Sequence, residues 1–364
     1  MSLTTIRTSN LDPSNSLNFR NRIINGDMQI DQRNNGSSVN SSGSGSFAVD
    51  RFASFAAGGG VYTTQRSTDV PTGQGFINSI VNTVTTIDSP SGTDYYVIQQ
   101  AIEGFNTADL GWGTASAKSV TVSFWVKSSL TGTYTVAFRN SALNRSYRAT
   151  YTITSANTWE QKAITIPGDT SGTWLTDNGA GIRLGFTLGA GSDYIDTGNV
   201  WSALEDFAAT GQTQWIATLG ATFHLTGVQL EVGTAATAFE RLPYSTELAL
   251  CQRYYELHAD TYQHMQVPMG YLTYLAGYWK FLVPKRAAPT VSDARSLTGT
   301  TFTNCVDQFG QGAFTPTSMS IDNASINGCR LALIFGSNVG NAGTTSGDMI
   351  NIQKSGLFQA SAEL

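Results

Sequence analysis

The segment FHLTGVQLEVGTAATAFERLPYSTELALCQRYY, residues 223–255, marks the place where one kind of structure ends and another begins. Gly233 is expected to turn the chain, and an extended FERLPY stretch then leads to Ser245, which is placed to cap a short helix. We therefore expect a sheet domain to close here and a second β-rich part to follow. The apolar residues expected along the closing strand are Phe223, Leu225, Val228 and Leu230.

Upstream of this junction the chain has the pattern of many short strands. In SVTVSFWVKS, residues 119–128, apolar and polar side chains alternate, with Trp125 on the polar side. The stretches TYTVAF, SYRATYTI, WEQKAITI and RLGFTL repeat this pattern between clusters of Gly, Asn, Asp and Ser. The sequence therefore predicts an all-β protein whose first domain is an antiparallel jelly-roll sandwich.

The patterns divide the chain into four expected parts. Residues 1–20 are polar and aperiodic, as expected of an N-terminal arm that is ordered only when bound. Residues 21–244 form the predicted jelly-roll domain, and residues 245–257 form a linking helix whose broad apolar stripe predicts burial on most of its circumference. Residues 258–364 contain several further strand-like runs and are expected to form a smaller, β-rich C-terminal domain.

Composition narrows the classes of partner. Charged residues make up 13% of the 364 residues, below the roughly 25% usual for soluble domains, and the net charge is −5. A surface rich in Ser, Thr and Asn suits neutral ligands and argues against nucleic acid, which requires Lys and Arg to neutralise phosphate. No apolar run approaches the ~18 residues of a membrane span, so no membrane insertion is expected. The N-terminus lacks the apolar core of a secretory signal, so synthesis in a cytoplasm without export by that route is expected.

The search for a catalytic set gives no convincing candidate, so we expect a protein that is not an enzyme. Cys251 and His258 lie seven residues apart, but no third group that would orient them is evident. Two pairs of acids, Asp193 with Asp196 and Glu205 with Asp206, are the candidates for a glycan-cleaving site. Because neighbours in one loop rarely face each other across a substrate, both pairs are expected to be surface turn acids.

Aromatic residues in Gly-rich, loop-like surroundings are the better candidates for ligand contact. Sugars stack their C–H faces on such rings while amides and carboxylates bond their hydroxyl groups. Packing competes with binding as an interpretation, and for Trp125 packing under a covering loop is preferred. The candidate glycan-binding residues are Trp125, Trp174, Trp201, Tyr95, Tyr96 and Tyr194.

Several of these stretches together resemble bacteriophage tail-fibre and virion-surface proteins. The residues that carry the resemblance are VQLEVGTAATAFERLPYSTELALCQRYYE (228–256), IINGDMQIDQR (23–33), FAVDRF (47–52) and the runs that begin at Gln99, Val120 and Asn157. The resemblance covers roughly residues 20–257, together with FLVPKRAAPT and the final SAEL. It implies a virion protein with a jelly roll similar to carbohydrate-binding modules, commonly a homotrimer on a tail or fibre.

The resemblance also raises the question of calcium. Carbohydrate-binding modules of this shape hold a structural calcium ion with acids from their first and last strands. Here Asp27 matches the opening motif and Asp50 is a second candidate ligand, but Thr226 and Gly227 stand where the acids of the closing strand are expected. An ion pair between Asp50 and Arg51 is the alternative, and no other cofactor is expected.

Three functional hypotheses follow. The leading one is a phage tail fibre that recognises a host cell-surface polysaccharide and contacts other tail or virion proteins. The alternatives are a baseplate, adaptor or capsid-decoration protein that binds no sugar, and a glycan depolymerase. In the first, Tyr271, Tyr274, Tyr278 and Trp279 of the C-terminal domain are further candidates for receptor or subunit contact.

Overall fold

The computed structural model describes residues 20–258, 262–266, 274–293, 305–307, 313–314, 318–334, 349–353 and 358–364. The contacts divide the chain into two compact units, the first ending at Pro243 and the second spanning Tyr244–Glu363. Each is built from antiparallel sheets, so the predicted all-β class is confirmed. The expected N-terminal arm lies outside the described residues, apart from Arg20.

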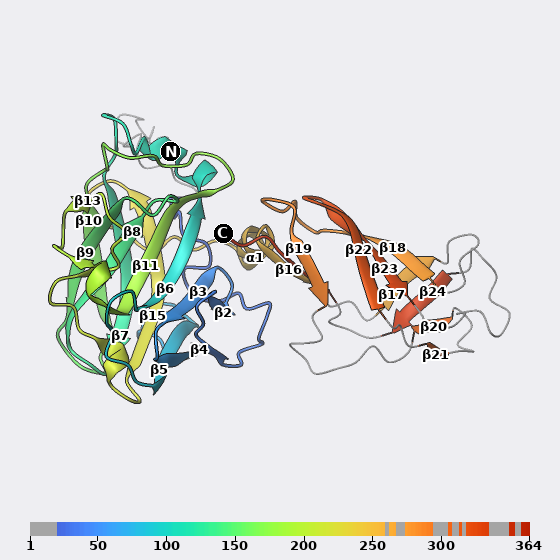
Figure 1. Cartoon of the computed structure of the whole chain (residues 1–364), viewed down its shortest axis with the longest axis horizontal. Helices are drawn as coiled ribbons and strands as arrows, with labels where there is room; N and C mark the ends of the chain where they lie inside the picture. The colour runs from blue at the N-terminus through green and yellow to red at the C-terminus, as the bar shows by residue number, and fades with distance from the viewer. Residues whose placement is uncertain are drawn as a thin grey trace, which may run out of the picture. The chain divides into compact units, whose positions relative to one another are not determined.

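The first unit is a sandwich of two sheets, in which every neighbouring pair of strands is antiparallel (Figure 1). The six-stranded sheet has the order β1 (Val39–Asn40), β4 (Val61–Ser67), β5 (Ser79–Thr86), β15 (Thr222–Val232), β7 (Val120–Ser128) and β10 (Glu160–Ile166). The seven-stranded sheet has the order β13 (Trp201–Ser202), β9 (Ser146–Ile153), β8 (Gly132–Arg139), β11 (Ala180–Ala190), β6 (Tyr95–Glu103), β3 (Phe52–Ala57) and β2 (Ser46–Val49). The chain passes repeatedly between the sheets, as a jelly roll requires.

The core lies between the inner faces of these sheets and follows the predicted alternation. In β7, Val122, Phe124 and Val126 are fully buried. From the facing sheet, Phe138 of β8 and Phe186 of β11 join the same cluster. Because side chains along a strand point alternately to its two faces, the residues between them project outward, where Ser123 is covered and Trp125 is half-buried. Short helical turns connect some strands: η2 (Gly104–Asn106), η3 (Ala108–Leu110), η4 (Ser192–Tyr194) and η5 (Trp215–Ala217).

The motif at the start of the sandwich has a backbone role. A Cβ atom on Gly26 would lie 2.2 Å from the carbonyl oxygen of Val228, so only glycine fits beside the last strand. The Val228 N–H donates to the Gly26 carbonyl at 2.9 Å. The backbone of Asn25 is left-handed, with a φ of 59°. Its side-chain amide donates to the carbonyls of Ile30 and Asp50. The first turn of the domain is thereby fixed to its closing strand.

The helix is shorter than the sequence analysis predicts. Helix α1 spans Tyr244–Gln252, and residues Tyr255–His258 instead form strand β16. Within the helix only Cys251 is buried, so the expectation of burial around most of the circumference is wrong. The aromatic pair Tyr254 and Tyr255 is buried beyond the helix end. Strand pairing with β25 (Phe358–Ser361), 100 residues later in the chain, overrides the local helical pattern. No described helix has the length and apolarity needed to span a bilayer.

The second unit contains two antiparallel sheets in its described part. The three-stranded sheet is β16, β25 and β19 (Thr290–Asp293), and the larger sheet has the order β21 (Ala313–Phe314), β20 (Cys305–Asp307), β24 (Met349–Gln353), β17 (Tyr262–Gln266), β18 (Tyr274–Lys280), β23 (Gly328–Ile334) and β22 (Ser318–Ser325). Lys285 and Glu256 form a buried ion pair, 2.6 Å from Nζ to Oε2. Of the aromatic residues expected to make contacts here, Tyr278 is exposed and Trp279 is buried, whereas Tyr271 lies outside the described residues.

Candidate functional site

The outward face of the seven-stranded sheet carries small residues at its middle. Strand pairing aligns Gln99 of β6, Gly185 of β11, Ala137 of β8 and Arg148 of β9 in one row across this face. The two central positions of this row, Gly185 and Ala137, are its smallest residues. A Cβ atom on Gly185 would lie 2.8 Å from Cγ2 of Val97, which explains why the position is glycine.

One long segment lies over part of this outward face. Residues 191–214, which we call the covering segment, run from the end of β11 to η5 and include β12 (Ile195–Asp196), β13 and β14 (Ala208–Ala209). The N–H of Ala209 donates to the hydroxyl of Thr135 at 3.0 Å. The side-chain amide of Gln212 donates to the Thr187 carbonyl at 2.8 Å. These bonds fix the covering segment to the outward side of β8 and β11.

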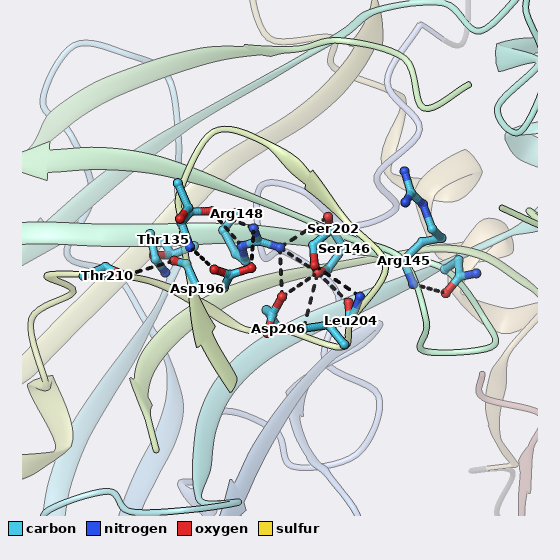
Figure 2. Close-up of polar contacts among 12 residues, drawn as sticks. Thr135, Arg145, Ser146, Arg148, Asp196, Ser202, Leu204, Asp206 and Thr210 are labelled. Carbon is cyan, nitrogen blue, oxygen red and sulfur yellow. Dashed lines mark hydrogen bonds and ion pairs between the residues drawn. The ribbon is translucent and has the colours of Figure 1, made fainter. Parts of the chain in front are cut away.

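A buried guanidinium provides the main attachment of the covering segment (Figure 2). Arg148 is fully buried, and its Nη1 donates to Asp206 Oδ2 at 2.9 Å. Its Nη2 donates to the Thr197 carbonyl at 2.6 Å, and Asp196 lies 3.6 Å away. Burial raises the pKa of Asp206, while Arg148 lowers it and Asp196 raises it further. Since Asp206 and Arg148 are both removed from water, each supplies the charge that compensates the other.

Beside this attachment lies a cleft of about 190 Å³ between the sheet and the covering segment. It is smaller than the roughly 300–1,000 Å³ typical of pockets for drug-sized ligands, so it fits one part of a ligand. Its lining combines apolar rings with charged and amide groups. The lining residues are Phe55, Tyr95, Val97, Gln99, Arg139, Leu143, Arg183, Glu205 and Phe207.

The aromatic rings on one side of the cleft pack closely against one another. The rings of Tyr95 and Phe207 stack with centroids 4.5 Å apart and planes 8° from parallel. Tyr194 packs edge-on against both rings, at 5.8 Å from Tyr95 and 4.9 Å from Phe207. The structure therefore brings together two residues that the sequence analysis named, Tyr95 and Tyr194, with one that it missed.

The charged side contains two guanidinium groups and one carboxylate. The Arg139 guanidinium lies 3.8 Å from the centroid of the Phe207 ring and donates to Glu205 and to the side-chain carbonyl of Gln99. Burial lowers the pKa of Arg139 to about 10, with Glu205 opposing the shift and Arg183 adding to it. Burial also lowers the pKa of Arg183, opposed by Glu205. At neutral pH both arginines therefore keep their charge in a partly dry cleft.

Two of the tryptophans named from sequence, Trp174 and Trp201, form a different cluster with Trp112. Trp112, Trp174 and Trp201 meet edge-to-face, with centroid distances of 4.8, 5.3 and 5.6 Å. Each indole N–H is satisfied within the protein: Trp112 by the Lys118 carbonyl, Trp174 by Asp169 and Trp201 by the Pro167 carbonyl. Trp174 is buried and Trp201 is half-buried. Because each indole N–H already has a partner within the protein, this geometry favours a packing role over sugar contact.

Two other named aromatics lie away from the cleft. Tyr96 belongs to β6 but projects into the core, where it is fully buried and bonded to Asp88 and to the Gly60 N–H. The expectation that Tyr95 and Tyr96 lie in a loop is wrong, because both belong to β6. Successive residues of a strand face opposite sides, so Tyr96 faces the core. Trp125 is half-buried on the outward face of the six-stranded sheet, near Gly227. Neither is placed to share a ligand with Tyr95.

The carboxylates named for calcium already have protein partners. Asp50 forms an ion pair with Arg33 at 3.0 Å and accepts hydrogen bonds from Gln32. Arg33 is thus one cationic partner of Asp50, and Arg51, the partner offered from sequence, donates to the Ala101 carbonyl. Asp27 accepts a hydrogen bond from Gln29, and burial raises its pKa. Among the described residues no group of three or more His, Cys, Asp or Glu side chains forms a possible metal site.

Comparison with known proteins gives distant structural likenesses. No protein-family model matches the chain, and no curated protein matches it significantly. The enzymatically active domain of tailspike protein 4 from bacteriophage CBA120 is similar over 59% of this chain, at 14% identity and a TM-score of 0.31, and the match spans only 22% of that chain. A family 11 carbohydrate-binding module of a Clostridium thermocellum cellulase is similar over 52% of this chain and 92% of its own, at 15% identity and a TM-score of 0.28.

A third solved structure, a xylan-binding domain from Paenibacillus barcinonensis, is similar over 54% of this chain and 99% of its own, at 12% identity and a TM-score of 0.29. These likenesses are too distant to transfer a function to this chain. What the structure itself shows is a jelly-roll sandwich with a partly charged, aromatic-lined cleft on one outward face.

Proposed function

We propose that the first unit recognises a glycan through the cleft between the seven-stranded sheet and the covering segment. The supporting observation is the stacked pair of Tyr95 and Phe207 beside the polar groups of Gln99, Arg139 and Arg183. An aromatic face with hydrogen-bonding groups at its edge is the combination that a sugar ring uses, since it has apolar C–H faces and a polar rim.

We further propose that the chain is a phage virion protein, most simply a tail fibre that contributes to attachment to the host surface. The resemblance of residues 228–256 and 23–33 to phage fibre proteins supports this assignment. The proposal includes a homotrimer, contacts with other tail or virion proteins, assembly into the particle after synthesis in the host cytoplasm, and a binding role without catalysis. A solution mass near three times the 38.9 kDa of one chain is expected, and a monomer would contradict the trimer.

The cleft is tested by removing its aromatic side without disturbing the core. We expect the full chain to bind glycans on an array of bacterial surface polysaccharides. Tyr95→Ala should weaken binding by about tenfold or more, as loss of an anchoring aromatic contact does. Phe105→Ala is the matched control, because Phe105 is 61% exposed and does not line the cleft.

Two outcomes would contradict the proposal. If the wild-type chain binds no glycan on the array, the non-receptor structural role becomes the better assignment. If binding survives Tyr95→Ala while the variant keeps the wild-type unfolding temperature, the site is elsewhere on the protein. Release of reducing sugar from a bound polysaccharide would favour the depolymerase instead.

A further inference from the structure

Arg183 is a cation that has no hydrogen-bonded anion in the described part of the chain, although Glu205 acts on it electrostatically. Its side chain lines the cleft, but it makes no hydrogen bond or ion pair with any residue that the structure describes, and its Nε is buried. Other arginines of the same unit are matched by acids: Arg22 by Asp109, Arg33 by Asp50, Arg139 by Glu205, Arg145 by Asp169 and Arg148 by Asp206. A partly buried guanidinium without a hydrogen-bonded partner raises the free energy of the folded state. An external ligand that supplies such a partner is therefore the best explanation of Arg183.

The neighbours of Arg183 leave it as the group that can receive an anion. Strand pairing places Arg183 directly opposite Arg139 on the outward face. Arg139 already donates to Glu205 and Gln99, so its guanidinium is largely occupied. Two guanidinium groups and one carboxylate leave one net positive charge in the cleft. That excess matches a ligand group that carries a single negative charge.

The shape of the donor indicates which anion. A guanidinium offers planar, forked N–H groups that pair with both oxygens of a carboxylate at once. The partly exposed Tyr95 ring, supported by the buried Phe207 ring, gives the cleft a stacking surface and an anion partner within one small volume. A sugar that carries its own carboxyl group, such as a uronic or nonulosonic acid, satisfies both.

We propose that the ligand of this cleft is an acidic glycan whose sugar carboxylate pairs with Arg183. The inference rests on the proposed glycan recognition and adds the chemical class of the sugar. It also revises the expectation from composition that the surface suits neutral ligands, because a chain of net charge −5 concentrates an unmatched positive charge at one point.

The experiment compares carboxylated oligosaccharides with their carboxyl-reduced forms, using the full chain and isothermal titration calorimetry. The probes are oligomers of galacturonate, hyaluronan and sialic acid. We expect binding to at least one acidic probe, and a loss of affinity of about tenfold or more on reduction of its carboxyl groups, because a hydrogen-bonded ion pair is removed. Binding to the acidic form should also weaken as salt is added.

Variants locate the effect at one side chain. Arg183→Gln should reduce affinity for the acidic probe by the same factor as carboxyl reduction, and should leave affinity for the reduced probe unchanged. Arg22→Gln is the matched control, since Arg22 belongs to the same unit, pairs with Asp109 and does not line the cleft. Unfolding temperatures of both variants establish that a loss of binding is not a loss of fold.

The outcomes separate this inference from the function on which it rests. Equal affinity for acidic and reduced probes, or array binding confined to neutral glycans, overturns the carboxylate while glycan recognition stands. Preferential binding to a teichoic acid, whose anion is a phosphodiester, also overturns it. If the wild-type chain binds no glycan of any kind, the proposed function itself fails.

Discussion

On the outward face of the six-stranded sheet, Lys127 pairs with Asp69 and lies 5.4 Å from the centroid of the Trp159 ring. The indole N–H of Trp159 donates to the same carboxylate at 3.1 Å, so Lys127, Asp69 and Trp159 all contact one another. On the outward face of the seven-stranded sheet, Arg183 has no such partner among the described residues. The two outward faces thus differ: Lys127 on one is paired with an acid, whereas Arg183 on the other is paired with none of the described acids. The unpaired Arg183 marks the face that is suited to an external anion.

The faces differ equally in what lies over them. The seven-stranded sheet carries the covering segment, whose fully buried ion pair between Arg148 and Asp206 holds a loop close to the sheet. Such a pair adds little net stability relative to apolar packing, but breaking it leaves one charge buried and uncompensated. This face therefore combines a strong dependence on one ion pair with a preformed cleft.

The largest effect is expected from breaking that attachment. Arg148→Met removes the cation and leaves Asp206 buried, so the free energy of unfolding should fall by about 3–5 kcal/mol. Urea denaturation followed by circular dichroism measures it. Arg22→Gln, which disrupts an exposed pair, should cost less than about 1 kcal/mol. A similar small loss for Arg148→Met would show that the covering segment does not depend on this ion pair.

The next effect concerns pH and the opposite face. Burial lowers the pKa of His224 to about 4, from 6.5, with Lys127 adding to the shift and Asp69 opposing it. Because the folded state binds the proton more weakly than the unfolded state, this contribution to stability is complete above pH 6.5 and is lost as the pH falls towards 4. The loss should amount to about 3 kcal/mol by pH 4.

The test of that effect is urea unfolding at pH 7 and at pH 4. His224→Gln, which cannot take up a proton, should lose less stability than the wild type between these values. If both proteins lose stability equally, acid sensitivity does not arise from this histidine on the six-stranded face.

The smallest effect is expected from the matched cation. Lys127→Met disrupts an ion pair whose acid is 46% exposed, so the free energy of unfolding should change by less than about 1 kcal/mol. Affinity for glycans should not change, in contrast to Arg183→Gln. A loss of glycan affinity in the Lys127 variant, measured by the same calorimetry, would remove the distinction between the two faces.

The sandwich could be predicted from sequence because local and tertiary preferences agree there. Strict alternation in β7 and β9 places apolar residues inward without any knowledge of the partner strand, and the structure confirms it. The end of α1 could not be predicted, because Tyr255 leaves the helix to pair with Ser361. A contact made so far along the chain has no trace in the local pattern.

The site was accessible to sequence only in part. Tyr95 and Tyr194 were named for their aromatic character, and both lie at the cleft, although Tyr96 beside them faces the core. Glu205 was named only as a candidate acid for glycan cleavage. Arg139 and Arg183 were missed, because an arginine among alternating residues is interpreted as a solvated cation. Only the strand order β8, β11, β6 places these charges and Gln99 on one surface. The small residues Ala137 and Gly185, each two positions from an arginine on the same strand face, were the available signal.

The covering segment begins and ends at the same outward side of the sheet, between Ala190 and Trp215, and none of its residues is needed to pair the central strands. Loops of this kind tolerate changes of length and sequence far better than the strands that carry them. Exchange of this stretch would alter the mouth of the cleft and leave the central strands intact, provided that an acid still pairs with the buried Arg148.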